Sequence, residues 1–114
     1  VEEGKADVDK ARTEDGATPL LMAVLNGHTE VVRFLVEEGK ADVDKAKTTG
    51  VTPLMKAAQN GHLDVVSELI AASADQSIET TEPDAEEEIP VGSTALSVAQ
   101  RKGHSEVAAL LAAR

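Results

Sequence analysis

Several residue types are missing from this chain, and each absence narrows what it can be. It contains no cysteine, tryptophan or tyrosine, and Phe34 is its one phenylalanine. Without cysteine there are no disulfide bonds, thiolate metal sites or thiol nucleophiles. Hydrophobic residues make up 41 % of the chain, but they are mainly alanine, valine and leucine. We therefore expect a thin core, built by close approach of backbones instead of by bulky rings.

Long apolar runs and a surplus of basic residues are also missing. No apolar run approaches the roughly 18 residues of a membrane span, and no signal peptide is recognisable. The sequence therefore predicts a soluble, intracellular protein, cytoplasmic by default, with no membrane contact. The net charge of −10 would repel phosphate backbones, and no aromatic platform is present for bases to stack on. Nucleic acid is therefore not an expected partner.

The negative charge is concentrated in one segment, residues 73–91, which contains no basic residue. Outside this segment the chain has 14 of its 21 acids and all 11 bases. The net charge of that remaining part is therefore only −3. The composition of the segment, with two prolines and few apolar residues, predicts a flexible loop. The seven acids of the segment are Asp75, Glu79, Glu82, Asp84, Glu86, Glu87 and Glu88.

Internal repetition is the strongest pattern in the chain. Three stretches align on a shared threonine: GATPLLMAVLNGHTEVVRFLV at 16–36, GVTPLMKAAQNGHLDVVSELI at 50–70 and GSTALSVAQRKGHSEVAALLA at 92–112. The segment VEEGKADVDKA also occurs twice, at residues 1–11 and 36–46. Such self-similarity is typical of proteins that stack one supersecondary unit several times.

Each unit predicts two short helices. Thr18 and Thr52 are good helix N-caps, and the proline after each suits the first helical position. Glycine after the first helix favours a left-handed C-terminal cap, and a second helix with paired apolar residues follows, as at Val31, Val32, Leu35 and Val36. The first helices are predicted at Leu20–Asn26, Leu54–Asn60 and Leu96–Lys102. Helices this short bury their faces only by stacking unit on unit.

The motifs TPL, NGH, VV and GxADVD, in this order, resemble the ankyrin repeat. The resemblance covers nearly the whole chain apart from residues 73–91 and implies an all-α solenoid of antiparallel helix pairs with β-hairpin-like finger loops. The expected organisation is a single domain, 1–114. It comprises the end of a truncated repeat with its finger (1–15), a repeat (16–49), a repeat with an acidic finger insertion at about 73–91 (50–91), and a C-terminal repeat (92–114).

Candidate chemistry is sparse. His28, His62 and His104 occupy one position in each unit, but stacked helices lie ~8–10 Å apart, too far for these rings to share an ion. We expect them to tie each loop to neighbouring backbone, with no metal site and no cofactor. The serines lie in no nucleophile motif and no glycine-rich phosphate loop is present. The chain is therefore not expected to be an enzyme, and no catalytic residue is assigned.

The resemblance also implies candidate contact positions, because finger residues and the ends of first helices line the concave groove of ankyrin stacks. A partner-attracting role is assigned to the acidic loop residues Glu79, Glu82, Asp84, Glu86, Glu87 and Glu88. With no tryptophan or tyrosine as an anchor, affinity should be modest. The contact positions are Glu14, Asp15, Ala17, Leu25, Asn26, Thr48, Thr49, Val51, Gln59, Asn60, Ser93, Arg101 and Lys102.

The leading interpretation is a non-catalytic protein-interaction module that presents a concave surface to a protein partner. Its acidic loop would attract a Lys/Arg-rich segment of that partner. The alternative is a structural segment of a larger repeat protein, which packs on its own missing repeats or self-associates through an apolar flank of unit one (Leu20, Val31, Val32 and Leu35). The chain would then be a monomer or weakly self-associating. A simpler interpretation of the acidic loop is that it is a tolerated surface insertion with no role in binding.

Overall fold

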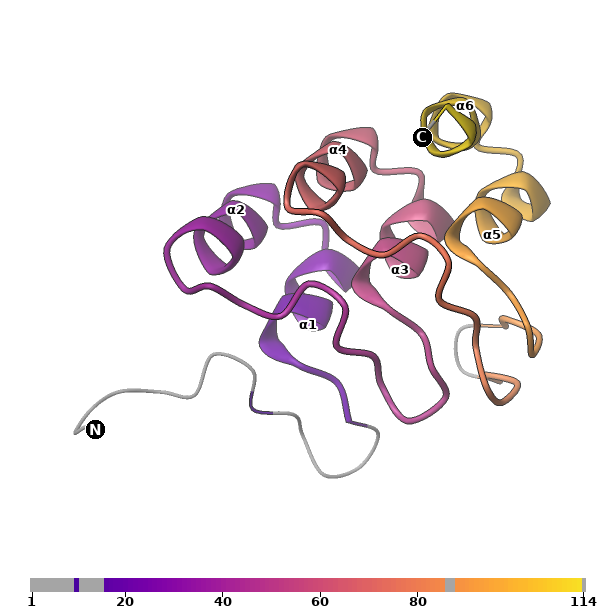
Figure 1. Cartoon of the computed structure of the whole chain (residues 1–114), viewed down its shortest axis with the longest axis horizontal. Helices are drawn as coiled ribbons and strands as arrows, with labels where there is room; N and C mark the ends of the chain where they lie inside the picture. The colour runs from indigo at the N-terminus through magenta and orange to yellow at the C-terminus, as the bar shows by residue number, and fades with distance from the viewer. Residues whose placement is uncertain (1–9, 11–15, 86–87, 114) are drawn as a thin grey trace.

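The computed structural model describes residues 10, 16–85 and 88–113 and contains three antiparallel helix pairs (Figure 1). The first helices lie side by side in the order α1, α3, α5, and the second helices form a parallel row α2, α4, α6. The expected all-α stack is confirmed, and no strand is assigned in the described ranges. The pairs are α1 Pro19–Leu25 with α2 Thr29–Glu37, α3 Pro53–Asn60 with α4 Leu63–Ala71, and α5 Ala95–Lys102 with α6 Ser105–Ala112.

Each first helix begins at the predicted threonine. The Oγ1 atoms of Thr18 and Thr52 accept hydrogen bonds from backbone N–H groups three residues on, at 3.1 and 3.2 Å. Thr94 does the same, and the hydroxyl of Ser97 accepts from the Thr94 N–H at 2.9 Å. This reciprocal capping box satisfies two helix donors at the one start where alanine stands in place of proline.

The glycines after α1 and α3 are required by the helix pair that follows each of them. A Cβ added at Gly27 would lie 2.8 Å from His62 Cε1, and one at Gly61 would lie 2.6 Å from His104 Nδ1. Both glycines also have positive φ angles, 71° and 72°, which side chains resist. His104 Nε2 lies 3.0 Å from the Gln59 carbonyl oxygen. The predicted role of this histidine, tying its loop to neighbouring backbone, is therefore confirmed.

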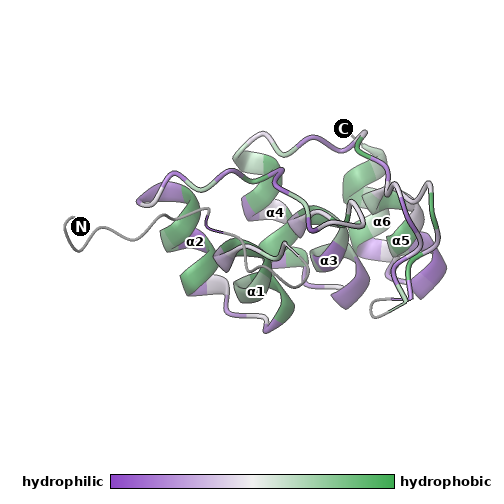
Figure 2. Ribbon diagram, turned by 90° about the horizontal axis from the view of Figure 1, so that it is seen from below, coloured by the Kyte–Doolittle hydropathy of each residue, from purple (hydrophilic) through white to green (hydrophobic). Residues whose placement is uncertain are grey.

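The core lies between the two rows of helices and continues from pair to pair. Ala57, Ala58 and Ala99 are completely buried, so the first helices approach closely, as expected. In α4, Val65 and Val66 are also fully buried. Figure 2 shows the hydrophobic residues concentrated in the paired helices. In the described part of the chain, no helix is long and apolar enough to cross a membrane.

The second helix of the first pair departs from the expected pattern. Of its predicted apolar residues, Val32 is fully buried, but Val31 is 45 % exposed. Phe34 is aligned with the partly buried Leu110, and the alignment therefore predicts a packing residue. In the structure, however, Phe34 is 60 % exposed. The predicted apolar flank also needs correction, because Leu20 and Val32 face the core. Val31 and Phe34 instead provide the exposed apolar surface of α2.

Two residues other than glycine adopt the left-handed conformation in the loops that follow α2 and α4. Lys40 follows α2 with φ 56° and Ser73 follows α4 with φ 68°. After Lys40 the Ala41 N–H donates to the Leu35 carbonyl at 2.9 Å, and after Ser73 the Ala74 N–H donates to the Leu69 carbonyl at 3.0 Å. Both loops return to the equivalent leucine, across six residues after α2 and five residues after α4. In each, a β-carbon strains the left-handed residue.

Lys40→Gly should stabilise the chain, because glycine adopts a positive φ without this strain. The expected gain in the free energy of unfolding is about 1 kcal/mol, after the greater chain entropy of glycine is subtracted. Urea denaturation measures it. The matched control is Lys45→Gly, at an exposed position outside the left-handed region, which should destabilise slightly. Equal effects of the two substitutions would contradict the explanation.

Leu54→Ala should lower the free energy of unfolding by about 2–5 kcal/mol, because a cavity would open in the core. Leu54 is 1 % exposed in the middle pair, so neither end of the stack can close the gap. Thermal and urea denaturation measure the loss. Val91→Ala is the control, since Val91 is 59 % exposed and should lose little. A melting temperature that Leu54→Ala barely moved would show that the helix register is wrong.

Candidate interaction surface of the fingers and first helices

The finger between the first two pairs, residues 39–50, is held by local hydrogen bonds. At its tip the Gly50 N–H donates to the Lys47 carbonyl at 2.8 Å and the Lys47 N–H donates to the Val51 carbonyl at 3.1 Å. Nearer the helices, Asp44 Oδ1 accepts from the Asp75 N–H at 2.8 Å. This last bond links the finger to the one that follows it.

Asp75 begins the second finger as a small hydrogen-bonded turn. Its Oδ1 accepts from the Ser77 hydroxyl at 2.6 Å and from the Ser77 N–H at 2.9 Å. These two bonds, the hydroxyl first, lower the pKa of Asp75. Because the folded-state pKa is lowered, the bonds stabilise the fold above the ordinary aspartate pKa. The contribution is lost as the pH falls through the lowered value.

The acidic insertion is folded, so the prediction of a flexible loop is wrong for its described residues. Asp84 and Ile89 exchange two backbone hydrogen bonds, at 2.8 and 3.0 Å. Thr80 exchanges backbone bonds with Ser93 and Gly92, and its hydroxyl donates to the Pro90 carbonyl at 2.8 Å. Thr80 and Ile89 are both buried. The described residues 80–85 and 88–93 are therefore held together by two sets of backbone hydrogen bonds.

This loop docks on the tip of the preceding finger through a buried ion pair. Lys47 Nζ lies 3.1 Å from Asp84 Oδ2, and the two side chains are only 5 % and 3 % exposed. The hydroxyl of Thr49 donates to the same Asp84 oxygen at 2.6 Å. We call Lys47, Thr49 and Asp84 the finger clasp. Since buried charges are tolerated when paired and hydrogen-bonded, the clasp satisfies this carboxylate inside the protein.

Backbone contacts reinforce the clasp. The Thr49 carbonyl accepts from the N–H groups of Thr81 and Glu82 at 3.0 and 3.3 Å. Gly50 makes this approach possible, because a Cβ there would lie 2.9 Å from the Thr81 nitrogen. Two neighbouring fingers are thus joined at their tips as well as near their bases.

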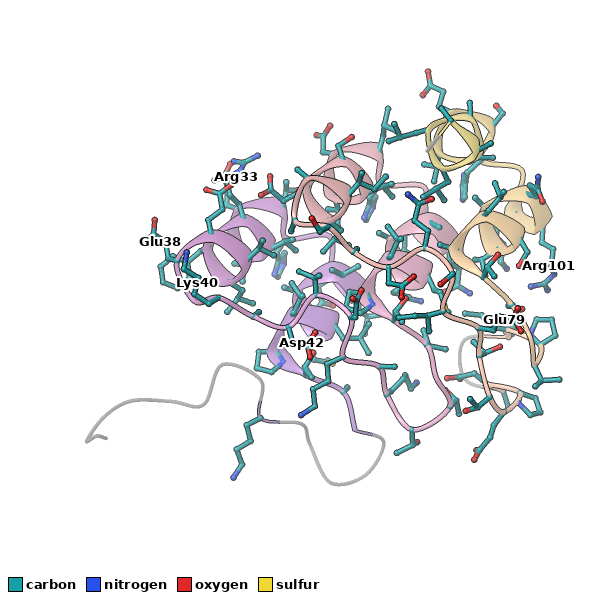
Figure 3. All side chains as sticks on the ribbon, in the orientation of Figure 1. Arg33, Glu38, Lys40, Asp42, Glu79 and Arg101 are labelled. Carbon is teal, nitrogen blue, oxygen red and sulfur yellow. The ribbon has the colours of Figure 1, made fainter. Side chains whose placement is uncertain are left out.

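The acids of the insertion therefore fall into different groups. Asp84 is buried in the clasp, which contradicts its predicted role in attracting a partner. Glu79, Glu82 and Glu88 are exposed, and Arg101 at the end of α5 contacts this region, its Nη2 donating to the Glu88 carbonyl at 3.4 Å. Figure 3 shows Glu79 and Arg101 on the same side of the molecule. Glu86 and Glu87 lie outside the described residues.

Some of the predicted contact positions are exposed in the structure and others are buried. Leu25, Asn26, Thr48, Arg101 and Lys102 are exposed, and Thr49, Gln59 and Asn60 are partly so. The ends of α3 and α5 carry hydrophilic residues in Figure 2, and the Asn60 amide donates to the Leu25 carbonyl of the neighbouring pair at 3.5 Å. These eight positions stay a prediction.

Ala17, Val51 and Ser93 are buried, so they cannot offer a surface to a partner in this conformation. Val51 belongs to the hydrophobic core, and the Ser93 hydroxyl donates to the Pro90 carbonyl at 2.7 Å. Each comes just before the cap of a first helix, where the finger turns inward. Glu14, Asp15 and the expected partial repeat at 1–15 fall outside the described residues, apart from Lys10.

No group of three or more potential metal ligands occurs in residues 10, 16–85 and 88–113. Of the three equivalent histidines, His28 is exposed, while the other two are partly buried between pairs. The clasp itself could not be predicted from the sequence. Lys47 carries no local sign of burial, and nothing in the sequence distinguishes Asp84 from the six other acids of its segment.

Asp84→Ala should destabilise the chain by about 3–5 kcal/mol, because the Lys47 ammonium would lose its carboxylate in a buried site. The double variant Lys47→Met with Asp84→Leu should recover most of this loss. Urea denaturation measures both, and hydrogen exchange of the Thr81 and Glu82 amides reports whether the loop has left the finger. Glu82→Ala, an exposed acid of the same loop, is the control. An equal loss from Asp84→Ala and Glu82→Ala would rule out the clasp.

Comparison with known proteins agrees with this architecture. The family model described as Ankyrin repeats (3 copies) matches residues 2–82, whereas a search of curated proteins gave no match. The match ends before α5, yet that helix has the same threonine cap and left-handed glycine as the middle pair. The chain belongs to the ankyrin repeat family.

Proposed function

We propose that this chain is a non-catalytic protein-interaction module. Ankyrin repeats generally mediate protein–protein interactions, and the structure has the stacked pairs and projecting fingers on which such binding depends. The proposed contact surface is the concave side between the fingers and the first helices. Its exposed positions include Leu25, Thr48, Arg101 and Lys102.

The observation that carries the proposal is the docking of the acidic insertion on the neighbouring finger. Because the clasp holds Asp84 inside, the exposed Glu82 lies beside the Thr48–Thr49 tip, one of the proposed contact sites. A fixed cluster of carboxylates loses less entropy on binding than a flexible one. The proposed partner therefore has a basic segment, drawn to Glu79, Glu82 and Glu88.

Electrostatic attraction of this kind acts mainly on the rate of encounter, which falls as salt screens the charges. Arg101 and Lys102 lie at the end of α5 near the same loop. The proposed surface therefore carries both signs of charge, and it would favour a basic segment that has acidic residues at a matching distance.

Neutralising the exposed carboxylates should slow binding of a basic segment. In the test variant Glu79, Glu82 and Glu88 are replaced by glutamine, which leaves the clasp intact. The probe is a fluorescent Lys/Arg-rich peptide, and stopped-flow measurement at low and high salt gives the association rate. We expect a several-fold slower rate at low salt and little difference at high salt.

The matched control replaces Glu38, Asp64 and Glu106 by their amides, three exposed acids on or beside the second helices. This change alters the net charge equally but leaves the fingers untouched. If both variants slow the peptide equally, the effect comes from net charge alone and the insertion has no special role. An unchanged rate at low salt for the test variant would overturn the proposal.

A further inference from the structure

Thr81 presents an exposed hydroxyl group beside the finger clasp. Its Oγ1 donates to the Thr49 carbonyl at 3.3 Å, which is long for a bond between a hydroxyl and a carbonyl oxygen. The neighbouring Thr80 differs, because it is buried and its hydroxyl donates to the Pro90 carbonyl at 2.8 Å. Of these two adjacent threonines, Thr81 is therefore the one that an enzyme can reach.

Acidic residues follow Thr81 at two particular places. Glu82 is the next residue, and Asp84 is the third residue after it. Among the serines and threonines of residues 39–50 and 73–94, Thr81 alone has acids at both places. A protein kinase whose peptide-binding groove is lined with lysine and arginine selects such a hydroxyl, because each acid forms a charge-assisted pair in the groove.

The closed clasp keeps one of these two acids away from such an enzyme. The Asp84 side chain is 3 % exposed, and its Oδ2 is bound by Lys47 Nζ and by the Thr49 hydroxyl. A kinase can pair with this carboxylate only when the loop has left the finger. Folded proteins undergo local openings of this kind without unfolding as a whole.

We propose that Thr81 is a phosphorylation site for an ATP-dependent protein kinase of acidic specificity, and that the phosphate holds the clasp open. The Thr81 oxygen attacks the γ-phosphorus of ATP, and the bond from that phosphorus to the bridging oxygen breaks, so that ADP leaves. The hydroxyl proton passes to the catalytic base of the kinase. Because the kinase modifies the open form and the phosphate prevents closure, modification shifts the population toward that form.

The phosphate prevents closure because it does not fit the closed arrangement. Phosphorylation removes the proton that Thr81 donates to the Thr49 carbonyl, and the phosphate oxygens that replace it repel this acceptor. The added charge of about −1.5 to −2 at pH 7 also lies close to the carboxylates of Glu82 and Asp84. Space is short as well, since a Cβ at Gly50 would lie 3.3 Å from Thr81 Oγ1.

Opening would change the proposed contact surface, a consequence that rests on the proposed function. The closed clasp holds Glu82 beside the Thr48–Thr49 tip and keeps the Lys47 ammonium buried. In the open form Glu82 leaves the tip and Lys47 becomes accessible there. Phosphorylation of Thr81 would thereby remove a fixed carboxylate from the place where the basic segment is proposed to bind.

The first experiment treats the folded chain with an acidophilic protein kinase and ATP labelled in its γ-phosphate. Peptide mapping should find the label on Thr81, and Thr81→Val should abolish it there. Thr49→Val should speed the modification several-fold, because valine keeps the shape of threonine but donates no hydrogen bond to Asp84. The matched control is Thr48→Val at the exposed neighbouring position, which should leave the rate unchanged.

The second experiment needs no kinase, because phosphothreonine is incorporated in place of Thr81 during synthesis of the chain. The amides of Thr81 and Glu82, which both donate to the Thr49 carbonyl, should exchange their hydrogens about tenfold faster or more. Rates are compared with those of a short peptide that carries the same phosphate. The Asp75 amide, bonded nearer the helices, should stay protected, which shows that the opening is local.

A phosphoserine in place of Ser105 is the matched control for charge. Ser105 is exposed at the start of α6, so the same charge is added away from the clasp. The amides of Thr81 and Glu82 should then exchange as they do in the unmodified chain.

Three results contradict the proposal. The first is a folded chain that the kinase leaves unmodified at Thr81, and the second is an equal rate for Thr49→Val and Thr48→Val. The third is a chain with phosphothreonine at position 81 whose amides stay as protected as before. These failures are distinct from failure of the proposed peptide binding, because no basic peptide enters either experiment.

Discussion

Close approach of one helix pair to the next is the constraint on which the structure depends. Two helices of seven to nine residues cannot form a stable interior alone, so the core exists only where pairs meet. Small residues allow that approach. Ala57, Ala58 and Ala99 are fully buried, and the glycines at the helix turns leave room for the histidine of the next pair. A chain with one aromatic residue can therefore still build a continuous core.

The fingers are joined by a different physical interaction. Helix pairs are held by apolar packing, whereas the finger tips are held by the buried pair of Lys47 and Asp84 and by hydrogen bonds to Thr49. An ion pair of this kind adds little stability over an apolar replacement. Its value lies in fixing one arrangement, since a charge removed from water tolerates few alternative positions. The second finger is thereby held alongside the first, although it is longer in sequence.

The part of the fold that the sequence predicts is the part governed by local interactions. Thr18, Thr52 and Thr94 cap helices through groups three residues away, so the helix starts agree with the prediction to within one residue. The course of the insertion depends instead on Lys47, which lies 37 residues before Asp84. Phe34 is misjudged for a related reason. Alignment of repeats identifies equivalent positions but not which of them is covered by a neighbouring helix among the described residues, where Phe34 is 60 % exposed.

The same distinction applies to the proposed contact surface. The contact between helix pairs depends on the repeated register, in which a glycine at one helix turn leaves room for the histidine of the next pair. The concave surface depends instead on the fingers, whose residues differ from repeat to repeat. The register therefore holds the fingers in a row, and the proposed binding rests on the sequence differences between them.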